Sequence, residues 1–269
     1  MMRKIWKNGK VFLEREWESL LSNTGFLYGE GLFETVKLRE GKPVFLEEHL
    51  TRMLNSSHIL DIPCSLSRRE IIEGCKNIVE ENGLSDGVLR IYLTPSAVFI
   101  KTDSTVPYKD KRFFRSIISS FKRNPSSHLV YHKTLNYYEN LLAKREALKE
   151  GYDEAILLNI NEEISEGAYS NFFLIKKGDV FTPTISSGLL PGITRKKVME
   201  IAKDKGIQVE EKVLILEDLK EADEAFFTSA LMGVMPCKEV RNIKEFTECE
   251  LSLELKHLLD ERERKSLTP

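Results

Sequence analysis

The stretch His132-Lys133-Thr134-Leu135-Asn136-Tyr137-Tyr138 places one lysine just upstream of a strongly helical segment, 139–147. The N-terminus of a helix carries partial positive charge, so a cation at that place is electrostatically disfavoured. The lysine can therefore be interpreted in two ways. It is either one more solvated residue among 40 lysines and arginines, or a lysine held neutral as an imine-forming nucleophile. Distant segments of the chain decide between the two.

Length and composition describe an ordinary soluble protein. The 269 residues can form one large domain or two modest ones, and 41% hydrophobic with 30% charged residues is typical of a globular chain. A net charge of −2 gives no reason to expect a nucleic-acid partner. The basic cluster 109–115 is accordingly interpreted as a solvated loop before a strand.

The cysteines and the N-terminal residues indicate a cytoplasmic protein. Cys64, Cys75, Cys237 and Cys249 form no CxxC pair and have no histidines at zinc-ligand spacing, so we expect reduced thiols and no metal site. The first residues lack the apolar core of a signal peptide, and no apolar stretch is long enough to span a bilayer. We therefore expect a cytoplasmic location and no membrane partner.

Hydrophobic periodicity predicts a mixture of strands and helices in both halves of the chain. The predicted strands are 4–6, 10–13, 32–38, 43–46, 88–93, 98–100, 154–159, 171–176, 180–182, 208–213 and 224–228. The predicted helices are 47–60, 67–82, 139–147, 194–205 and 216–221. Asn8-Gly9 and Glu40-Gly41 are expected to form hairpin turns, and Ser67 with Glu70 a capping box.

The same pattern suggests two lobes. Mixed strands and helices in each half favour an α+β architecture over a doubly wound sheet. The polar segments 102–107 and 124–127 bracket the expected boundary. We predict a small N-terminal α/β domain over 1–118, a linker over 119–126 and a larger C-terminal α/β domain over 127–269.

One acidic residue is placed where it can face a ligand. Glu166 lies in a turn of small residues between two strand-like runs of the segment 163–173. A carboxylate there can pair with the protonated ring nitrogen of a cofactor, or it can lie in water. The segment alone supports both interpretations.

Other segments suit a phosphate group. The glycine turn 188–195 leads into a predicted helix at Thr194, where free N–H groups and a hydroxyl favour a dianion. Plain helix capping by Thr194 is the alternative. Arg52 can offer a bidentate fork to phosphate or lie at the surface. The run 227–236, with small and hydroxyl residues after a buried strand, is a candidate second side of the cradle.

These features match the demands of one cofactor. Pyridoxal phosphate needs an imine-forming lysine, an acid at its pyridine nitrogen, a phosphate cradle and walls for its ring. Lys133, Glu166 and the segment 188–195 supply a candidate for each of the first three. Their joint presence favours the imine-forming interpretation of Lys133 over the solvated one.

Six motifs occur in an order that resembles the class IV aminotransferase family, the fold-type IV pyridoxal phosphate enzymes. The motifs are Tyr28–Thr35, His49–Arg52, Lys133 followed by Leu135–Tyr137, Ser165–Phe172, Leu190–Arg195 and Ala222–Glu224. The resemblance covers nearly the whole chain. It implies a fold of type IV with two α/β lobes, the cofactor between them, and a homodimer whose partner helps to shape each active site.

The resemblance also implies roles for single residues. Lys133 matches the catalytic Schiff-base lysine, and Glu166 matches the partner of the pyridine nitrogen. The other implied cofactor contacts are Arg52, Ile193 and Thr194 on the phosphate, Leu190 on one ring face and Tyr137 near the ring hydroxyl. Ala230 stands where many transaminases place a hydroxyl residue, so we expect that phosphate contact from the backbone or from Ser229.

The family contains several reactions, and the cofactor motifs do not separate them. Branched-chain enzymes usually carry Glu-Gly-Ile after the phenylalanine that matches Phe33, whereas this chain reads Glu34-Thr35-Val36. Well-studied D-amino acid enzymes carry tyrosine in place of Phe33 and an Arg-x-His pair, both missing here. The run 230–236 and the short chain resemble aminodeoxychorismate lyases.

We predict a transaminase that uses an amino acid and a 2-oxo acid, with D-amino acids ahead of L-branched-chain ones. Aminodeoxychorismate lyase is the alternative. Tyr28 and Phe33 are expected to contact the substrate, and Arg90 and Lys238 are candidate anchors for its carboxylate, or else surface cations. A cofactor-free binding protein on the same scaffold would have no use for the imine lysine.

Overall fold

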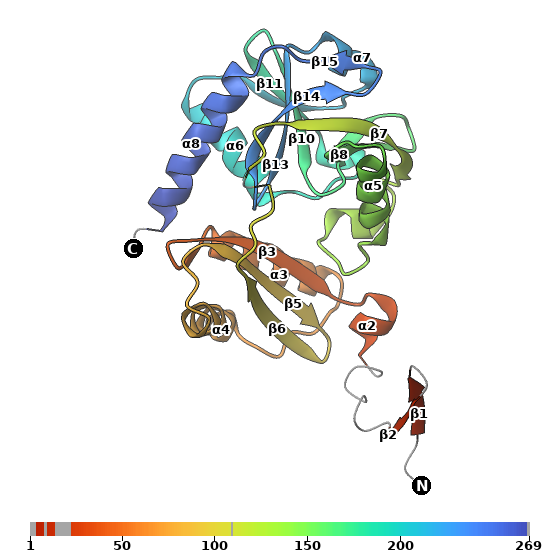
Figure 1. Cartoon of the computed structure of the whole chain (residues 1–269), viewed down its shortest axis with the longest axis vertical. Helices are drawn as coiled ribbons and strands as arrows, with labels where there is room; N and C mark the ends of the chain where they lie inside the picture. The colour runs from red at the N-terminus through yellow and green to blue at the C-terminus, as the bar shows by residue number, and fades with distance from the viewer. Residues whose placement is uncertain (1–3, 8–9, 14–22, 109, 268–269) are drawn as a thin grey trace.

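The computed structural model describes residues 4–7, 10–13, 23–108 and 110–267, which form two lobes (Figure 1). A hairpin of β1 (Lys4–Lys7) and β2 (Lys10–Leu13) precedes the first lobe, and its strands pair antiparallel as predicted. Its expected turn, Asn8-Gly9, lies outside the described residues. None of the helices in the described ranges is long and apolar enough to cross a membrane.

The smaller lobe is built on an antiparallel sheet with the order β4-β3-β5-β6. Its strands are β3 (Leu32–Arg39), β4 (Lys42–Pro43), β5 (Gly87–Thr94) and β6 (Ala97–Asp103), and its helices are α2 (Thr24–Tyr28), α3 (Leu46–Ile59) and α4 (Arg68–Glu81). The predicted strand 43–46 is shorter than expected, because Phe45 turns into a left-handed conformation (φ 52°) and α3 begins at once. The capping box of Ser67 and Glu70 is present at α4.

Strand β3 has two different faces, as its period-two sequence predicts. Leu32, Val36 and Leu38 are buried against α3 and α4 in the core of this lobe. Phe33 and Thr35 alternate with them and line the cavity between the lobes. One strand therefore contributes both to a hydrophobic core and to the candidate site.

The larger lobe is built on a nine-stranded sheet. Eight of its strands follow the order β12-β11-β10-β13-β14-β7-β8-β9, and the ninth, β15, pairs with β14. Its strands are β7 (Phe114–Arg123), β8 (Glu154–Asn159), β9 (Ile164–Gly167), β10 (Asn171–Lys176), β11 (Asp179–Pro183), β12 (Val209–Lys212), β13 (Glu224–Ser229), β14 (Gly233–Val240) and β15 (Lys244–Glu245). Its helices are α5 (Tyr138–Lys149), α6 (Ile193–Asp204), α7 (Leu216–Glu221) and α8 (Glu250–Ser266), with 3-10 turns η2 (His128–Tyr131) and η3 (Ile185–Ser187). The predicted strands β8 and β10 and helix α7 are confirmed at both ends.

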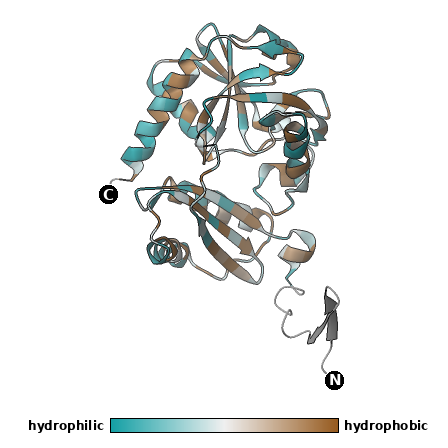
Figure 2. Ribbon diagram, in the orientation of Figure 1, coloured by the Kyte–Doolittle hydropathy of each residue, from teal (hydrophilic) through white to brown (hydrophobic). Residues whose placement is uncertain are grey.

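The large sheet curls back on itself. Ile164, in the last strand of the order, donates its N–H to the carbonyl of Leu214, just after the first strand, at 2.7 Å. The curled sheet encloses a core in which Phe114, Phe172 and Phe227 are fully buried. Figure 2 shows hydrophobic and hydrophilic residues mixed along the strands, while α8 is largely hydrophilic. The architecture confirms the predicted α+β fold with two lobes.

The predicted linker at 119–126 differs from the structure. Residues 114–123 form β7, which lies between β14 and β8 in the large sheet. The chain passes from the small sheet to the large one between Asp103 and Phe114. The serines of β7 interrupt the apolar pattern that would indicate a strand. The polar turn after Arg123 marks the end of this strand rather than a junction between domains.

Helix α8, which the sequence analysis did not predict, joins the two lobes. It packs on the large lobe through Leu255 and Leu259, and it runs down towards β3 in Figure 1. There Lys37 Nζ lies 2.7 Å from Glu263 Oε2, and Arg39 Nη2 lies 3.3 Å from Asp260 Oδ1. These ion pairs help to fix the lobes relative to one another.

Candidate active site

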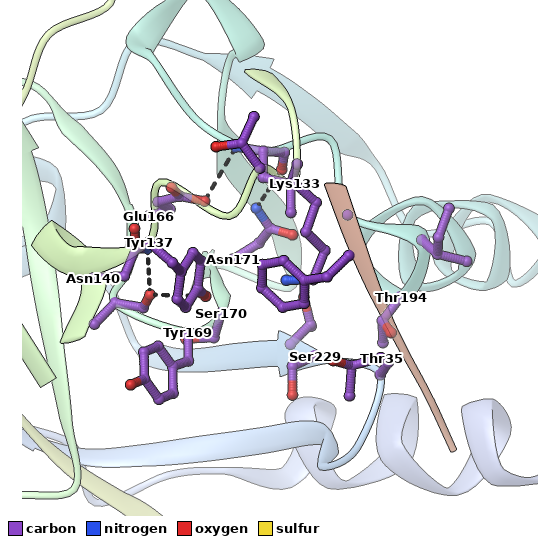
Figure 3. Close-up of a pocket in the computed structure, with 18 of the residues that line it drawn as sticks. Thr35, Lys133, Tyr137, Asn140, Glu166, Tyr169, Ser170, Asn171, Thr194 and Ser229 are labelled. Carbon is purple, nitrogen blue, oxygen red and sulfur yellow. Dashed lines mark hydrogen bonds between the residues drawn. The ribbon is translucent and has the colours of Figure 1, made fainter. Parts of the chain in front are cut away.

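A cavity of about 740 Å³ lies between the lobes and gathers most of the predicted site residues. The small lobe contributes residues of β3, β5 and α3, and the large lobe contributes those of β9, β10, α6 and the turn between β13 and β14. The predicted residues that line it are Phe33, Arg52, Arg90, Lys133, Tyr137, Glu166, Leu190, Ile193, Thr194, Ser229 and Ala230. Figure 3 shows Lys133, Glu166 and Thr194 around the same space.

Lys133 is held at the junction of the lobes by backbone pairing. Phe33 donates its N–H to the carbonyl of Lys133 at 2.9 Å, and Leu135 donates to Gly31 at 2.9 Å. The lysine side chain extends over aromatic rings, with Nζ 4.3 Å from the centre of the Phe33 ring and 5.2 Å from that of Tyr137. The segment thus behaves as an extra strand on the edge of β3, which sets the position of the amine.

Burial and, after it, the Arg52 guanidinium lower the pKa of Lys133 to about 8, although Glu34 and Glu166 oppose the change. Helix α5 begins only at Tyr138. Desolvation and a neighbouring guanidinium, rather than the helix N-terminus alone, therefore favour the neutral form of the Lys133 amine that the sequence predicts. With this pKa, a larger fraction of the amine is unprotonated near neutral pH than for an ordinary lysine, which suits a nucleophile or general base.

Glu166 is fixed from two directions. Its Oε1 accepts a hydrogen bond from Arg123 Nη2 at 2.9 Å, and its Oε2 accepts one from the Leu190 N–H at 3.1 Å. Burial raises the pKa of Glu166, and the Arg123 guanidinium counteracts that rise. Arg123 is not predicted from the sequence, because it lies at the end of β7 within the segment 119–126 that resembles a linker.

The candidate phosphate cradle lies where α6 begins. Its N-cap is Gly192, which has no side chain to cap the first N–H groups of the helix. Asn171 holds the turn by donating to the carbonyl of Leu190 at 2.8 Å. A Cβ atom on Gly192 would lie 2.0 Å from Asn171 Oδ1, so only glycine fits here. The uncapped N–H groups and the buried Thr194 are suited to bind an anion.

Arg52 reaches this cradle from the other lobe. It lies on α3, and its Nη1 donates to the carbonyl of Pro191 at 3.1 Å. Its Nε and Nη2 donate to the two carboxylate oxygens of Glu34 at 2.8 and 2.7 Å. Neither Glu34 nor its neighbour His49 was assigned a role from the sequence. The period-two alternation of β3 places Glu34 on the buried face, and this is the signal that could have found it.

Tyr137 belongs to an aromatic wall. Its ring stacks on Tyr169 with centres 5.5 Å apart and meets the edge of Phe33 at 5.1 Å. Burial raises the pKa of the Tyr137 phenol, and the charge of Glu166 raises it further. Tyr137 therefore remains a neutral hydrogen-bond donor, directed here at the Ala168 carbonyl 3.5 Å away.

The turn after β13 closes the cradle. Ser229 and Ala230 line the cavity, as does Thr228. The Thr228 hydroxyl is buried and has no hydrogen-bond partner in the described residues. A buried hydroxyl without a partner is costly, so it marks a position for a polar ligand. Thr228 is a third candidate, beside Ser229 and the backbone, for the contact that Ala230 does not supply.

The candidate substrate residues divide into two groups. Phe33 and Arg90 line the cavity, and Arg90 Nη1 lies 3.6 Å from Asp103 Oδ2. Tyr28 lies at the end of α2 with 75% of its surface exposed and is not among the lining residues. Lys238 is wrongly placed by the sequence analysis. It projects from β14 to the Thr247 carbonyl, 3.1 Å away, because that strand leads away from the cavity.

The fold and this cavity are those of a pyridoxal phosphate enzyme of fold type IV. The chain matches the family model "Amino-transferase class IV" over residues 31–240, and it belongs to that family. It is 32% identical to the putative branched-chain-amino-acid aminotransferase of Methanocaldococcus jannaschii, over 88% of each chain.

Two solved structures extend the comparison. A putative 4-amino-4-deoxychorismate lyase from Legionella pneumophila superposes with a TM-score of 0.84 and 27% identity, over 90% of this chain and 94% of the other. The branched-chain amino acid aminotransferase from Thermoproteus uzoniensis, solved with norvaline, superposes with a TM-score of 0.83 and 26% identity, over 98% and 97%. Members of the family thus include both transaminases and a lyase.

The residues present fit pyridoxal phosphate. The amine of Lys133 has a lowered pKa, and the carboxylate of Glu166 lies in the same cavity. The α6 N-terminus lacks a side-chain cap, and the Thr228 hydroxyl lacks a partner among the described residues. An amine, an acid and a polar cradle are the chemistry that this cofactor needs.

Proposed function

We propose that the protein is an aminotransferase that moves an amino group between an amino acid and a 2-oxo acid. The observation that carries the proposal is the convergence of Lys133, Glu166 and Arg52 on one cavity, with the Lys133 pKa lowered to about 8. When bound, pyridoxal phosphate supplies an electron sink for charge that develops at the α-carbon of the substrate.

The protein's own residues have separable tasks in this reaction. Lys133 Nζ holds or releases a proton near neutral pH, which suits a general base. Glu166 holds a proton at the pyridine nitrogen, and Arg123 favours the ionised carboxylate that this requires. Arg52 and the N-terminus of α6 hold the phosphate. Phe33 and Tyr137 exclude water from the space around the lysine amine.

We propose Arg90 as the anchor for the substrate carboxylate. It lies on β5 directly across from Thr35 in the antiparallel register, on the face that also carries Phe33. Its ion pair with Asp103 is long, at 3.6 Å, so the guanidinium can turn to a ligand. The predicted preference for D-amino acids over L-branched-chain ones rests on the sequence reasoning and stays part of the proposal.

A second candidate is aminodeoxychorismate lyase, which releases p-aminobenzoate and pyruvate. The similarity to the Legionella pneumophila protein favours it, and so does the run Ala230-Leu231-Met232-Gly233-Val234-Met235-Pro236 after β13. The cofactor residues would serve either reaction, because Lys133 would act as the general base in both.

A panel of substrates tests the proposal. The purified protein is mixed separately with D-alanine, D-glutamate, L-leucine and L-glutamate, and the visible absorbance of the cofactor is followed. Aminodeoxychorismate is run beside them with assays for pyruvate and p-aminobenzoate. Conversion of the cofactor by an amino acid supports the transaminase, and release of p-aminobenzoate without that conversion refutes it in favour of the lyase.

We also propose a homodimer. Phe26, Leu27 and Tyr28 of α2 expose 60%, 45% and 75% of their surface. Three adjacent exposed apolar side chains are typical of an interaction surface, and the family resemblance implies a partner that completes each site. Light scattering of the purified protein measures its mass, and a monomer at micromolar concentration would exclude the dimer.

A further inference from the structure

Glu34 is a carboxylate in a place where packing alone would put an apolar residue. It lies on the core face of β3, between Leu32 and Val36, and its relative exposure is 0%. A charge buried in this way is strongly unfavourable unless it is paired and fully hydrogen-bonded.

Both oxygens of Glu34 are occupied. Oε1 accepts from Arg52 Nε at 2.8 Å, and Oε2 accepts from Arg52 Nη2 at 2.7 Å. His49 Nδ1 lies 2.7 Å from the same Oε2. Burial opposes ionisation, but Arg52 and His49 outweigh it and hold the pKa of Glu34 at about 2. Glu34 is thus an anion throughout the physiological range.

This pairing leaves one nitrogen of the guanidinium free for another task. Nε and Nη2 face Glu34, so Nη1 is turned towards the cradle, where it lies 3.1 Å from the Pro191 carbonyl. His49 precedes Arg52 by one turn of α3, so both side chains leave the helix on the same face. The carboxylate and the imidazole together restrict how the guanidinium can rotate.

We infer that Glu34 and His49 are positioning residues that hold Arg52 ready for the cofactor phosphate. The inference rests on the proposed role of Arg52 as a phosphate ligand. A long arginine side chain loses conformational freedom when it binds, and a carboxylate that orders it beforehand removes that loss from the binding step. Glu34 acts through Arg52 and does not itself touch the cofactor.

The test compares two cofactor forms that differ in the phosphate alone. The full-length protein, freed of cofactor, is titrated with pyridoxal phosphate and with pyridoxal, and both dissociation constants are measured by absorbance. Glu34→Gln keeps the side-chain shape but places an NH2 group against the arginine. We expect the dissociation constant for pyridoxal phosphate to rise about tenfold. This is the lower end of the loss seen when a residue that orients a metal-binding side chain is removed. The dissociation constant for pyridoxal should change less than twofold.

His49 provides a second pair of variants. Asn can present an N–H group close to the position of Nδ1, whereas Leu cannot. We expect His49→Leu to weaken pyridoxal phosphate binding selectively, and His49→Asn to restore much of it. This rescue keeps the inference testable if Glu34→Gln does not fold.

Two controls separate the possible failures. Glu47→Gln removes a charge from the same helix, where Glu47 pairs with Arg68 at 3.0 Å, and should leave both constants unchanged. Arg52→Met tests the ligand role by itself. If Arg52→Met leaves the ratio of the two constants unchanged, the phosphate role of Arg52 is wrong. If Arg52→Met raises the ratio but Glu34→Gln does not, or weakens both forms equally, Glu34 is merely structural and the inference fails.

Discussion

Replacing Gly192 by alanine adds one methyl group at the base of the phosphate cradle. The backbone of Gly192 (φ −69°, ψ 140°) suits any residue, so the effect of the change is steric. The new Cβ would lie 2.0 Å from Asn171 Oδ1, whereas real contacts of this kind do not fall below 3.0 Å. Either the Asn171 side chain or the turn must therefore move by about 1 Å.

The cost can be worked out from the contacts that this movement breaks. Asn171 would lose its 2.8 Å hydrogen bond to the Leu190 carbonyl, worth about 1 kcal/mol. Overpacking adds about 1–3 kcal/mol, so the free energy of unfolding should fall by about 2–4 kcal/mol. The affinity for pyridoxal phosphate should fall as well, because the displaced turn carries the first N–H groups of α6.

Urea unfolding of the cofactor-free protein and titration with pyridoxal phosphate measure the two effects. The double variant Gly192→Ala/Asn171→Ala removes the atom that the methyl group meets, so it should be less destabilised than the sum of the single variants. A Gly192→Ala protein with unchanged stability and unchanged cofactor affinity would refute the steric reasoning.

Three further predictions concern charge, core and substrate. Folding lowers the pKa of Lys133 from 10.5 to about 8, which disfavours the charged amine. Lys133→Met should therefore stabilise the cofactor-free protein by up to about 3 kcal/mol at pH 7, and the gain should shrink between pH 8 and 10.5 in urea unfolding. Phe172→Ala empties a fully buried site and should cost about 3–5 kcal/mol in the same assay. Arg90→Ala should raise the KM for the amino acid about tenfold or more, whereas Lys238→Ala should not; equal effects would contradict the anchor.

Contiguous signals explain what could be predicted from the sequence. The strands at 154–159 and 171–176 have uninterrupted apolar runs, and the capping box of Ser67 is a local pattern. Lys133, Glu166 and the segment 188–195 were predicted as cofactor residues because each lies in a short motif with a chemical reason of its own. Lys133 and Glu166 could therefore be assigned to one site before their distance in space was known. The roles of Leu190, Ile193 and Tyr137 came from the family resemblance.

The rest depends on neighbours in space. Arg123 pairs with Glu166, and nothing in the surrounding sequence distinguishes it from a surface charge. The strand alternation does put Glu34 on the core face, but it does not reveal that Arg52 is its partner. Thr228 lies near the end of a buried strand, and the sequence does not indicate that its hydroxyl lacks a partner among the described residues. Lys238 was misplaced because sequence position next to a site segment does not reveal the direction in which a strand continues.

The division of the site between two lobes explains why the reaction is difficult to infer from the cofactor residues. The large lobe supplies Glu166 and the α6 N-terminus, which are proposed to hold the cofactor. The small lobe supplies Phe33 and Arg90 from one face of its sheet, and the Phe33 ring also lies against the Lys133 amine. Lys133 stands between them, paired by its backbone to β3. Arg90 is not among the proposed cofactor contacts, so a change there can alter which substrate binds while the proposed contacts to the cofactor stay in place.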